Sequence, residues 1–149
     1  IFTGNFVNGY KQGKGKFTFS DGSFYEGEFQ KGIVQGKGTF HWRDGRSYEG
    51  DWINNQMEGQ GTFIWPEGHK YIGTYKHSKK AGYGTYYWSD KYYYRGTWLN
   101  NAMHGDGELY EGNKLAKQGT FRYGRLIKMK GDSIGTSGDK MLNNFDISK

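Results

Sequence analysis

Aromatic residues and glycines recur along this chain at a constant spacing of 23 residues. The repeating unit is clearest from Tyr48 to Gly68, and its first position occurs six times, at residues 2, 25, 48, 71, 94 and 117. A glycine follows two residues after each start and an aromatic residue two residues later, as Gly50 and Trp52 do after Tyr48. Side chains two apart share one face of a β-strand, so this pattern predicts a strand with one aromatic face.

The second half of each unit repeats the alternation. In the unit that starts at Tyr48, the glycine pair Gly59 and Gly61 precedes Phe63 and Trp65, which predicts a second strand. Turn residues separate the strands: Asp-Gly or a related pair closes the units, and pairs such as Asn8-Gly9 and Asn54-Asn55 lie within them. The sequence therefore predicts an all-β chain, an antiparallel meander of successive hairpins.

The glycines on the aromatic face need a reason, because glycine weakens a strand. Gly50 lies between Tyr48 and Trp52, and Gly61 lies beside Phe63. We expect an aromatic ring from the adjacent strand to occupy the space above each of these glycines. Valine in place of Gly61 or Gly50 would then expel the ring, whereas Gln60→Val would be tolerated.

Composition agrees with a thin structure. Hydrophobic residues make up only 34% of the chain and the mean hydropathy is -0.97, yet 19% of the residues are aromatic. Aromatic side chains at fixed positions can bury one another along a single sheet. Cysteine is absent, which excludes disulfides. No apolar run approaches the ~20 residues that span a bilayer, and because the repeat is in register from residue 2, we expect the sequence to be a segment of a longer protein.

The net charge of +6 is concentrated near one end. Residues 1–116 carry 14 Lys and Arg against 12 Asp and Glu, whereas residues 117–130 carry five cations and no acid. A nucleic-acid surface spread over the repeats is therefore not expected. Two basic groups could contact an anionic surface weakly, namely a basic bulge within residues 76–80 and a C-terminal cluster. Their members are Lys76, Lys79, Lys80, Arg122, Arg125, Lys128 and Lys130.

Two parts of the chain depart from the pattern. Tyr87, Tyr92 and Tyr93 fall on the face that is otherwise polar, and either a partner contact or cross-strand packing explains them. In the sixth unit the glycines expected in a second strand are replaced by Lys128 and Lys130, which indicates a capping segment. The Gly- and Ser-rich residues after 130 are typical of a flexible linker, followed by a C-terminal tail.

No constellation of residues indicates catalysis. The four histidines fall at four different positions of the repeat, so repetition does not bring them together as a metal site. The Gly-x-Gly pairs lack the Lys-Ser/Thr ending of a phosphate loop. Recurring acids such as Glu26 and Glu49, or Glu28 and Asp51, indicate a solvated face. We therefore expect no catalytic residue, no metal and no cofactor, and a chain that is not an enzyme.

The sequences Tyr-Glu-Gly-Asp-Trp at 48–52 and Gly-Gln-Gly-Thr-Phe at 59–63 resemble the MORN (membrane occupation and recognition nexus) repeat, whose period is the same. The resemblance covers residues 1–124, with five full repeats starting at 2, 25, 48, 71 and 94 and a partial sixth at 117. Residues 125–149 are then the capping segment, linker and tail. The family implies an elongated, single-layer antiparallel sheet of about 11 strands with a groove along one face.

The resemblance also implies a function. Short proteins made almost wholly of MORN repeats resemble the structural scaffolds and adaptors of the family. In these the groove holds a helix or an extended segment of a protein partner within a larger complex. A cytoplasmic, cytoskeleton-associated setting, such as the axoneme of a cilium, is expected. Alternatives are a phospholipid-binding module at a membrane junction and the regulatory array of a larger enzyme. The expected groove residues are Phe29, Trp52, Tyr75, Trp98, Tyr48, Tyr71 and Tyr94.

Overall fold

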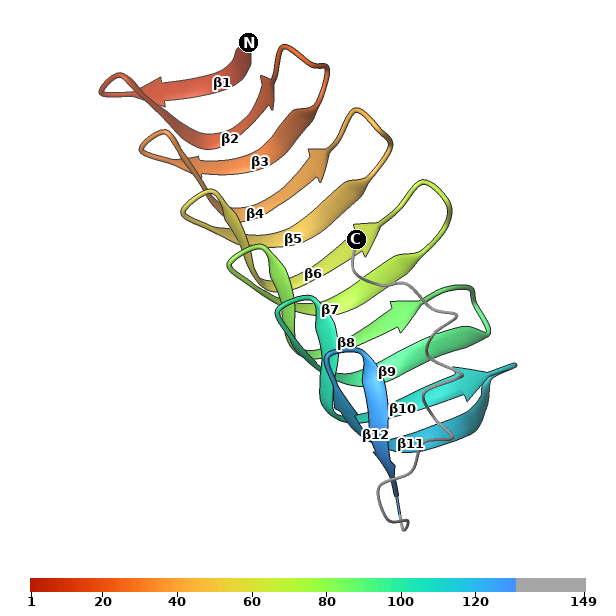
Figure 1. The fold of residues 1–149 in the computed structure, drawn as a ribbon. Helices are drawn as coiled ribbons and strands as arrows, with labels where there is room; N and C mark the ends of the chain where they lie inside the picture. The colour runs from red at the N-terminus through yellow and green to blue at the C-terminus, as the bar shows by residue number, and fades with distance from the viewer. Residues whose placement is uncertain (131–149) are drawn as a thin grey trace. The chain divides into compact units, whose positions relative to one another are not determined.

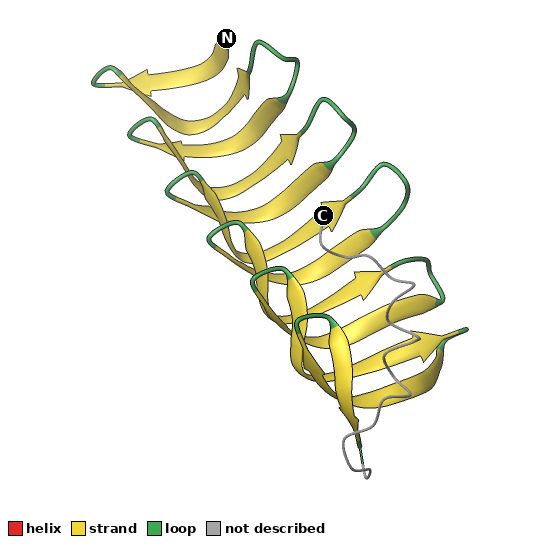
Figure 2. Cartoon of the chain, viewed as in Figure 1, coloured by secondary structure: helices red, strands yellow, loops and turns green. Residues whose placement is uncertain are grey.

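The computed structural model describes residues 1–130, and these form strands and turns without any helix (Figures 1 and 2). Every strand pairing described is antiparallel, and the strands follow one another in the sheet in sequence order. The all-β hairpin meander is thereby confirmed. The linker and tail predicted for residues 131–149 lie outside the described residues. The strands are β1 (Phe2–Val7), β2 (Tyr10–Thr18), β3 (Phe24–Gln30), β4 (Ile33–His41), β5 (Ser47–Ile53), β6 (Gln56–Ile64), β7 (Lys70–Lys76), β8 (Lys79–Tyr87), β9 (Tyr92–Leu99), β10 (Ala102–Glu111), β11 (Lys114–Arg122) and β12 (Arg125–Met129).

The chain divides into two compact units. Unit 1 contains Ile1–Lys70 and Tyr75–Ser78, so it holds β1 to β6 and both ends of β7. Unit 2 contains Tyr71–Thr74 and, of the described residues, 79–130, so it holds the centre of β7 and β8 to β12. The same local rules build both units.

One row of glycines crosses the strands of each unit. In unit 1 each strand contributes one glycine, and each is paired with the next across the ladder. In unit 2 the row runs from Gly84 through Gly96 and Gly107 to Gly119, which pairs with Met129 of β12. The row in unit 1 is Gly4, Gly15, Gly27, Gly38, Gly50 and Gly61.

The other glycine of each Gly-x-Gly pair has a different task. Gly59 has a φ of 97°, a conformation that glycine adopts without steric cost. It lies where the register between β5 and β6 shifts, because Gly50 pairs with Gly61 whereas Trp52 pairs with Met57. The extra residues of β6 form a bulge, which bends the strand at this point. One glycine therefore shapes the backbone and the other leaves space for a ring.

The inner turns are two-residue turns with left-handed backbone. Asn54 and Asn55 have φ values of 50° and 67°, and His77 and Ser78 have 51° and 63°. This combination is typical of the type I′ turns that join twisted antiparallel strands. The basic segment at 76–80 is therefore not a bulge, as the sequence suggested, but a regular hairpin turn.

A hydroxyl replaces the glycine that one closing turn lacks. In the turn between β8 and β9, the Ser89 hydroxyl accepts weak hydrogen bonds from the backbone N–H groups of Lys91 and Tyr92, each at 3.3 Å. Such a side-chain contact stabilises a turn without a left-handed residue. The loss of Asp-Gly at this point therefore leaves the hairpin intact.

The capping segment contains a strand that the repeat pattern did not predict. We expected about eleven strands, and the structure has a twelfth, β12, which pairs with β11. Glycines are missing there, but Leu126 is only 2% exposed and occupies the repeat position of Met57 and Met103. The apolar contact at this position is enough to form the last hairpin.

Candidate functional site

The Tyr48 ring covers the glycines of its own strand and of the next. A Cβ atom placed on Gly61 would overlap with the Tyr48 ring, and one on Gly50 would lie 2.8 Å from the Tyr48 hydroxyl oxygen. Equivalent rings occupy the equivalent space elsewhere. Tyr25 covers Gly38, and within unit 2 Tyr94 covers Gly107. The prediction that a ring from the adjacent strand packs over each glycine is confirmed for Gly61, but above Gly50 the nearest atoms are the backbone of β6 and the hydroxyl of Tyr48 from the same strand.

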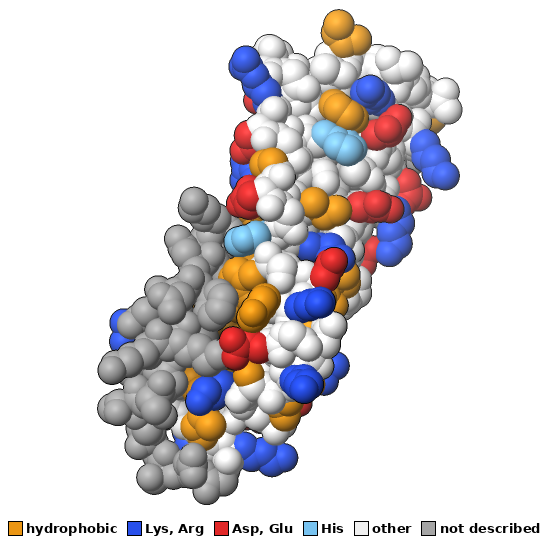
Figure 3. Space-filling model, turned by 90° about the vertical axis from the view of Figure 1, so that its right-hand side faces the viewer, with side chains coloured by type: hydrophobic (Ala, Val, Ile, Leu, Met, Phe, Trp, Pro, Cys, Tyr) orange, Lys and Arg blue, Asp and Glu red, His pale blue; other side chains and the backbone are white. Residues whose placement is uncertain are grey.

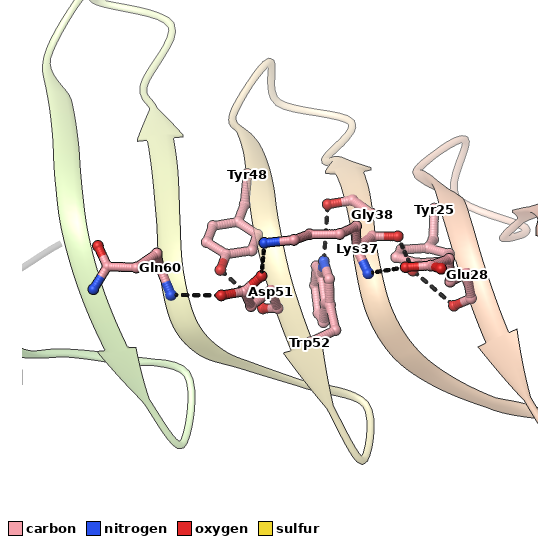
Figure 4. Close-up of polar contacts among 8 residues, drawn as sticks. All are labelled: Tyr25, Glu28, Lys37, Gly38, Tyr48, Asp51, Trp52 and Gln60. Atoms are coloured by element: carbon pink, nitrogen blue, oxygen red, sulfur yellow. Dashed lines mark hydrogen bonds and ion pairs between the residues drawn. The ribbon is translucent and has the colours of Figure 1, made fainter.

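Hydrogen bonds fix these rings in place (Figure 4). The Tyr48 hydroxyl donates to the carbonyl oxygen of Asp51 at 2.9 Å, and the Trp52 indole N–H donates to the carbonyl oxygen of Gly38 at 3.0 Å. The Asp51 carboxylate accepts a hydrogen bond from the backbone N–H of Gln60 at 2.9 Å and forms an ion pair with Lys37. Asp51, one of the acids that we expected on a solvated face, thus also accepts a backbone hydrogen bond within the bulge of β6.

All seven aromatic residues that we expected to line a binding groove lie in the core. None is more than 6% exposed. Their rings meet edge to face, with centroids 5.2 Å apart for Tyr48 and Trp52 and 5.2 Å for Tyr94 and Trp98. The structure gives these rings a packing role, and a contact with a partner through them stays a prediction. The seven are Phe29, Trp52, Tyr75, Trp98, Tyr48, Tyr71 and Tyr94.

Burial changes the acidity of the core tyrosines. Desolvation raises the pKa of Tyr25 to about 12. Burial also raises the pKa of Tyr48, Tyr71 and Tyr94. These hydroxyls therefore remain donors throughout the neutral range.

Lys80 is not on the surface, although we expected it to contact an anionic one. Its residue is 2% exposed, and its ammonium group lies 5.8 Å from the ring centroids of Tyr71, Tyr86 and Trp98. Lys80 occupies the repeat position that Met57 and Met103 occupy in the adjacent repeats. Burial lowers the pKa of Lys80 to about 8. The aromatic cage partly offsets the loss of hydration, but this lysine cannot reach a lipid surface in this conformation.

The other predicted cations are exposed. Lys76 and Lys79 flank the inner turn at His77 and Ser78, while the C-terminal group belongs to the last hairpin and its end. Binding of these side chains to an anionic surface stays a prediction. The C-terminal group is Arg122, Arg125, Lys128 and Lys130.

A hollow in unit 1 lies on the polar face, opposite the aromatic core. Its cavity volume is about 1090 Å³. Its lining includes Thr39 and Thr62 beside acids such as Glu26 and Glu49 and cations such as Lys16. Sequence alternation placed these residues on the polar face, but the hollow itself was not predicted. Figure 3 shows that Lys and Arg side chains lie among Asp and Glu side chains on the surface in view, without a broad area of one sign.

Unit 2 has a second hollow on its polar face, with a volume of about 590 Å³. Tyr83 and the ion pair between Arg95 and Glu108, at 3.0 Å, line part of it. Lys128 and Lys130 line another part. This size is within the range of binding pockets in general, and the wall combines aromatic, cationic, acidic and neutral polar groups, the acids being Asp106 and Glu108.

The polar-face tyrosines pack across the strands. Tyr87 and Tyr93 have ring centroids 5.2 Å apart, and Tyr93 stacks on Tyr110 at 4.7 Å and 14°. The guanidinium of Arg95 lies 5.0 Å from the centroid of Tyr110. Of the two explanations that we considered for these residues, cross-strand packing accounts for Tyr87 and Tyr93, whereas Tyr92 is 43% exposed.

The two hollows present groups that can recognise a partner. No group of three or more His, Cys, Asp or Glu side chains within residues 1–130 is placed to hold a metal ion. Nor does this part of the chain contain a helix that is long and apolar enough to cross a membrane. The hollows offer hydrogen-bond donors and acceptors, aromatic rings and charges to a bound segment.

Comparison with protein families supports the repeat assignment. The MORN repeat model matches residues 2–24, 25–45, 48–70, 71–91 and 94–113, so five consecutive matches cover most of the chain. A search of curated proteins found no match. The matched segments begin at the starting positions that the 23-residue spacing defines.

Proposed function

Because this chain belongs to the MORN repeat family, we propose that it is a non-enzymatic scaffold or adaptor that holds a segment of a protein partner against its sheet. MORN repeats are typically a non-catalytic module, often one that interacts with proteins or membranes. The proposal concerns which surface does this. The setting that the family resemblance favours is a larger cytoplasmic complex associated with the cytoskeleton, for example in a cilium.

One observation carries the proposal. The side chains of the aromatic face are buried against one another. The polar face of unit 1 instead contains the large hollow, whose lining includes Thr39, Thr62, Glu26 and Glu49. Gly27, Gly38 and Gly50 are among its lining residues, so the row of glycines contributes backbone to the floor of the hollow. Helices and extended segments both bind in grooves of this kind.

Site-specific photo-cross-linking in cells tests the proposal. A photoreactive residue replaces Thr39 in one variant and Glu67, in a closing turn outside the hollow, in the control. Cross-linked peptides are then identified by mass spectrometry. We expect the same protein segment to be recovered repeatedly from the Thr39 variant and not from the control. Equal recovery from both positions, or no protein from either, would refute binding in the hollow.

Localisation is tested separately. A tagged chain carrying the charge reversals Glu26→Lys and Glu49→Lys is compared with the unaltered chain by microscopy. We expect the unaltered chain to concentrate on a cytoskeletal structure and the variant to disperse. A diffuse distribution of both forms would contradict the cytoskeletal setting without deciding whether a segment binds.

A second function is favoured by the exposed basic residues of the last hairpin. Arg122, Arg125, Lys128 and Lys130 are exposed, and residues 117–130 contain no acid. Each basic residue near an anionic bilayer contributes roughly 1 kcal/mol. If lipid binding is the task, the chain floats with anionic vesicles at physiological salt and an Arg122→Gln, Arg125→Gln variant does not. A regulatory array of a larger enzyme remains compatible with either surface.

A further inference from the structure

β12 is the outermost strand of the sheet order, and it is unusually basic. Among the described residues its backbone pairs with β11 on one side only. The strand and its next residue contain Arg125, Lys128 and Lys130. By contrast β1, which begins the order, contains no charged side chain. An unpaired strand edge offers backbone donors and acceptors to another extended segment.

The three cations lie on one face. Phe121 pairs with Leu126, and both are buried on the aromatic face. The register then shifts, so that Thr120 pairs with Lys128, and the backbone N–H of Lys130 donates to the carbonyl oxygen of Gln118 at 2.8 Å. Thr120 and Gln118 alternate with the buried Phe121 and the glycine row, so they belong to the polar face. Lys128 and Lys130 beside them share that face.

Arg125 completes this basic strip, which we define as Arg125, Lys128 and Lys130. Arg125 pairs with Arg122 across the hairpin. The two arginines adjoin the buried pair Leu126 and Phe121 in sequence, so their side chains project to the opposite, polar face. From Arg125 to Lys130 the strip spans about 17 Å at the rise of a strand. All three residues are exposed, and none forms an ion pair within residues 1–130. Like charges opposite one another repel, so an acidic occupant would relieve this repulsion.

The unit 2 hollow provides space beside the strip. Lys128, Met129 and Lys130 form part of its wall, and Gln118 and Thr120 supply polar groups next to them. Side chains of an added strand that project onto the polar face would enter this space. Lys128 and Lys130 of the strip therefore form part of the wall of the hollow, which extends from β8 to β12 and also contains Asp106 and Glu108.

We propose that the β12 edge binds an acidic, extended protein segment, which pairs with the strand and places alternate carboxylates opposite the basic strip. This inference rests on the proposed function and names the chemistry of one partner. Strand addition uses both features of the edge, because backbone pairing provides affinity and alternate side chains provide specificity. A lipid surface could use the charges alone, and the cations could instead only prevent two copies from pairing through this edge.

Two synthetic peptides of identical composition test the proposal. In one Glu and Thr alternate, and in the other all Glu residues precede all Thr residues. Binding of each to the full chain is measured by fluorescence anisotropy at about 0.15 M salt, where surface charges more than about 8 Å apart are screened. We expect the alternating peptide to bind at least about tenfold more tightly, because only its carboxylates match the two-residue spacing of a strand. We also expect slower amide exchange in residues 125–129 when it is bound.

Matched variants locate the site. Lys128→Gln with Lys130→Gln should weaken binding of the alternating peptide about fivefold, since exposed ion pairs contribute little each. Arg43→Gln with Lys91→Gln changes the net charge equally, in closing turns away from β12, and should leave binding unchanged. All four side chains are exposed, so both variants should fold.

Three results would overturn the inference. Equal affinity for the two peptides shows attraction by charge without strand pairing. Binding to anionic vesicles with no binding of either peptide assigns the strip to lipid. Binding to neither leaves the cations a purely protective role at the edge. Cross-linking at Thr39 in unit 1 is independent of all three, so the proposed function can hold where this inference fails.

Discussion

The ring of Tyr48 fills the space that Gly61 leaves on the neighbouring strand, and its hydroxyl then reaches the carbonyl oxygen of Asp51 at 2.9 Å. One contact therefore joins two strands, and the hydrogen bond anchors the same ring to its own strand. Tyr25, Tyr71 and Tyr94 make the same hydrogen bond at 2.9 Å, each to the carbonyl oxygen three residues later. The repeat is built around this relationship.

Alanine at Gly61 tests the ring-over-glycine contact. The added methyl group would overlap with the Tyr48 ring, and overpacking of this kind costs about 1–3 kcal/mol of unfolding free energy. Gly61 does not have a left-handed backbone, so strain of φ does not contribute. Urea denaturation followed by tryptophan fluorescence measures the loss. Thr62→Ala, on the opposite face, is the control, and equal stability of the two variants would contradict the packing described.

Removal of the Tyr48 hydroxyl tests the hydrogen bond separately. Tyr48→Phe keeps the ring over Gly61 but leaves the Asp51 carbonyl oxygen without this donor. We expect a loss of about 1 kcal/mol in unfolding free energy. The exposed Tyr83 provides the comparison, since Tyr83→Phe should change stability very little. A Tyr48→Phe chain as stable as the original would show that the hydroxyl is not used.

Lys80→Met should stabilise the protein at neutral pH. Methionine fits this repeat position, as Met57 and Met103 show, and carries no charge into the aromatic cage. The folded pKa of Lys80 is about 8, below the ordinary lysine value of 10.5. Below pH 8 both folded and unfolded chains are protonated, so the burial penalty is complete, on the order of 3 kcal/mol.

The advantage of Lys80→Met should shrink as the pH rises. Between about pH 8 and 10 the folded chain releases the Lys80 proton while the unfolded chain keeps it, so the original protein gains stability relative to the variant. Denaturation midpoints at several pH values measure this. Lys79→Met, at an exposed neighbour, should show no such trend. A pH-independent difference for Lys80→Met would mean that the pKa of Lys80 is the same in the folded and unfolded chains.

The core tyrosines predict a loss of stability at high pH. The folded pKa of Tyr25 is about 12 and the pKa of Tyr48 is also raised, so folding favours their protonated forms. This contribution is complete below about pH 10 and is lost as the pH rises towards 12. In a pH titration of the folded chain, tyrosinate absorbance should show a group of tyrosines that ionises only near pH 12. In the denatured chain these tyrosines should ionise near pH 10. Absence of the late-ionising group from the folded chain would contradict the burial of these rings.

The period of the sequence predicted the fold because the constraints are local. Gly50 and Gly61 each alternate with aromatic residues on the same face of their strands. The space that each leaves empty predicted a ring from the adjacent strand. The left-handed φ of Gly59 could not be predicted in the same way, because the bulge depends on the pairing of β5 with β6. Likewise, β12 forms through Leu126 although its glycines are lost.

The site was less predictable from the sequence than the fold. A single sheet with an aromatic face suggested an open groove at Trp52 and Trp98, but strand curvature and edge-to-face packing bury both rings. From the sequence we grouped Lys80 with its basic neighbours as an exposed cation. Its repeat position, which it shares with Met57, indicates burial instead. Each hollow on the polar face is lined by residues of several strands, an arrangement that alternation along the sequence does not reveal.

Hydroxyl-radical footprinting of the free protein tests the central claim most directly, namely that the aromatic face is a packed core and not an open groove. Oxidation rates are normalised to those of the denatured chain. We predict strong protection of Trp52 and Trp98 and little protection of Tyr83, which is 58% exposed. Oxidation of Trp52 and Trp98 as readily as Tyr83 would show an open aromatic groove and would contradict the account.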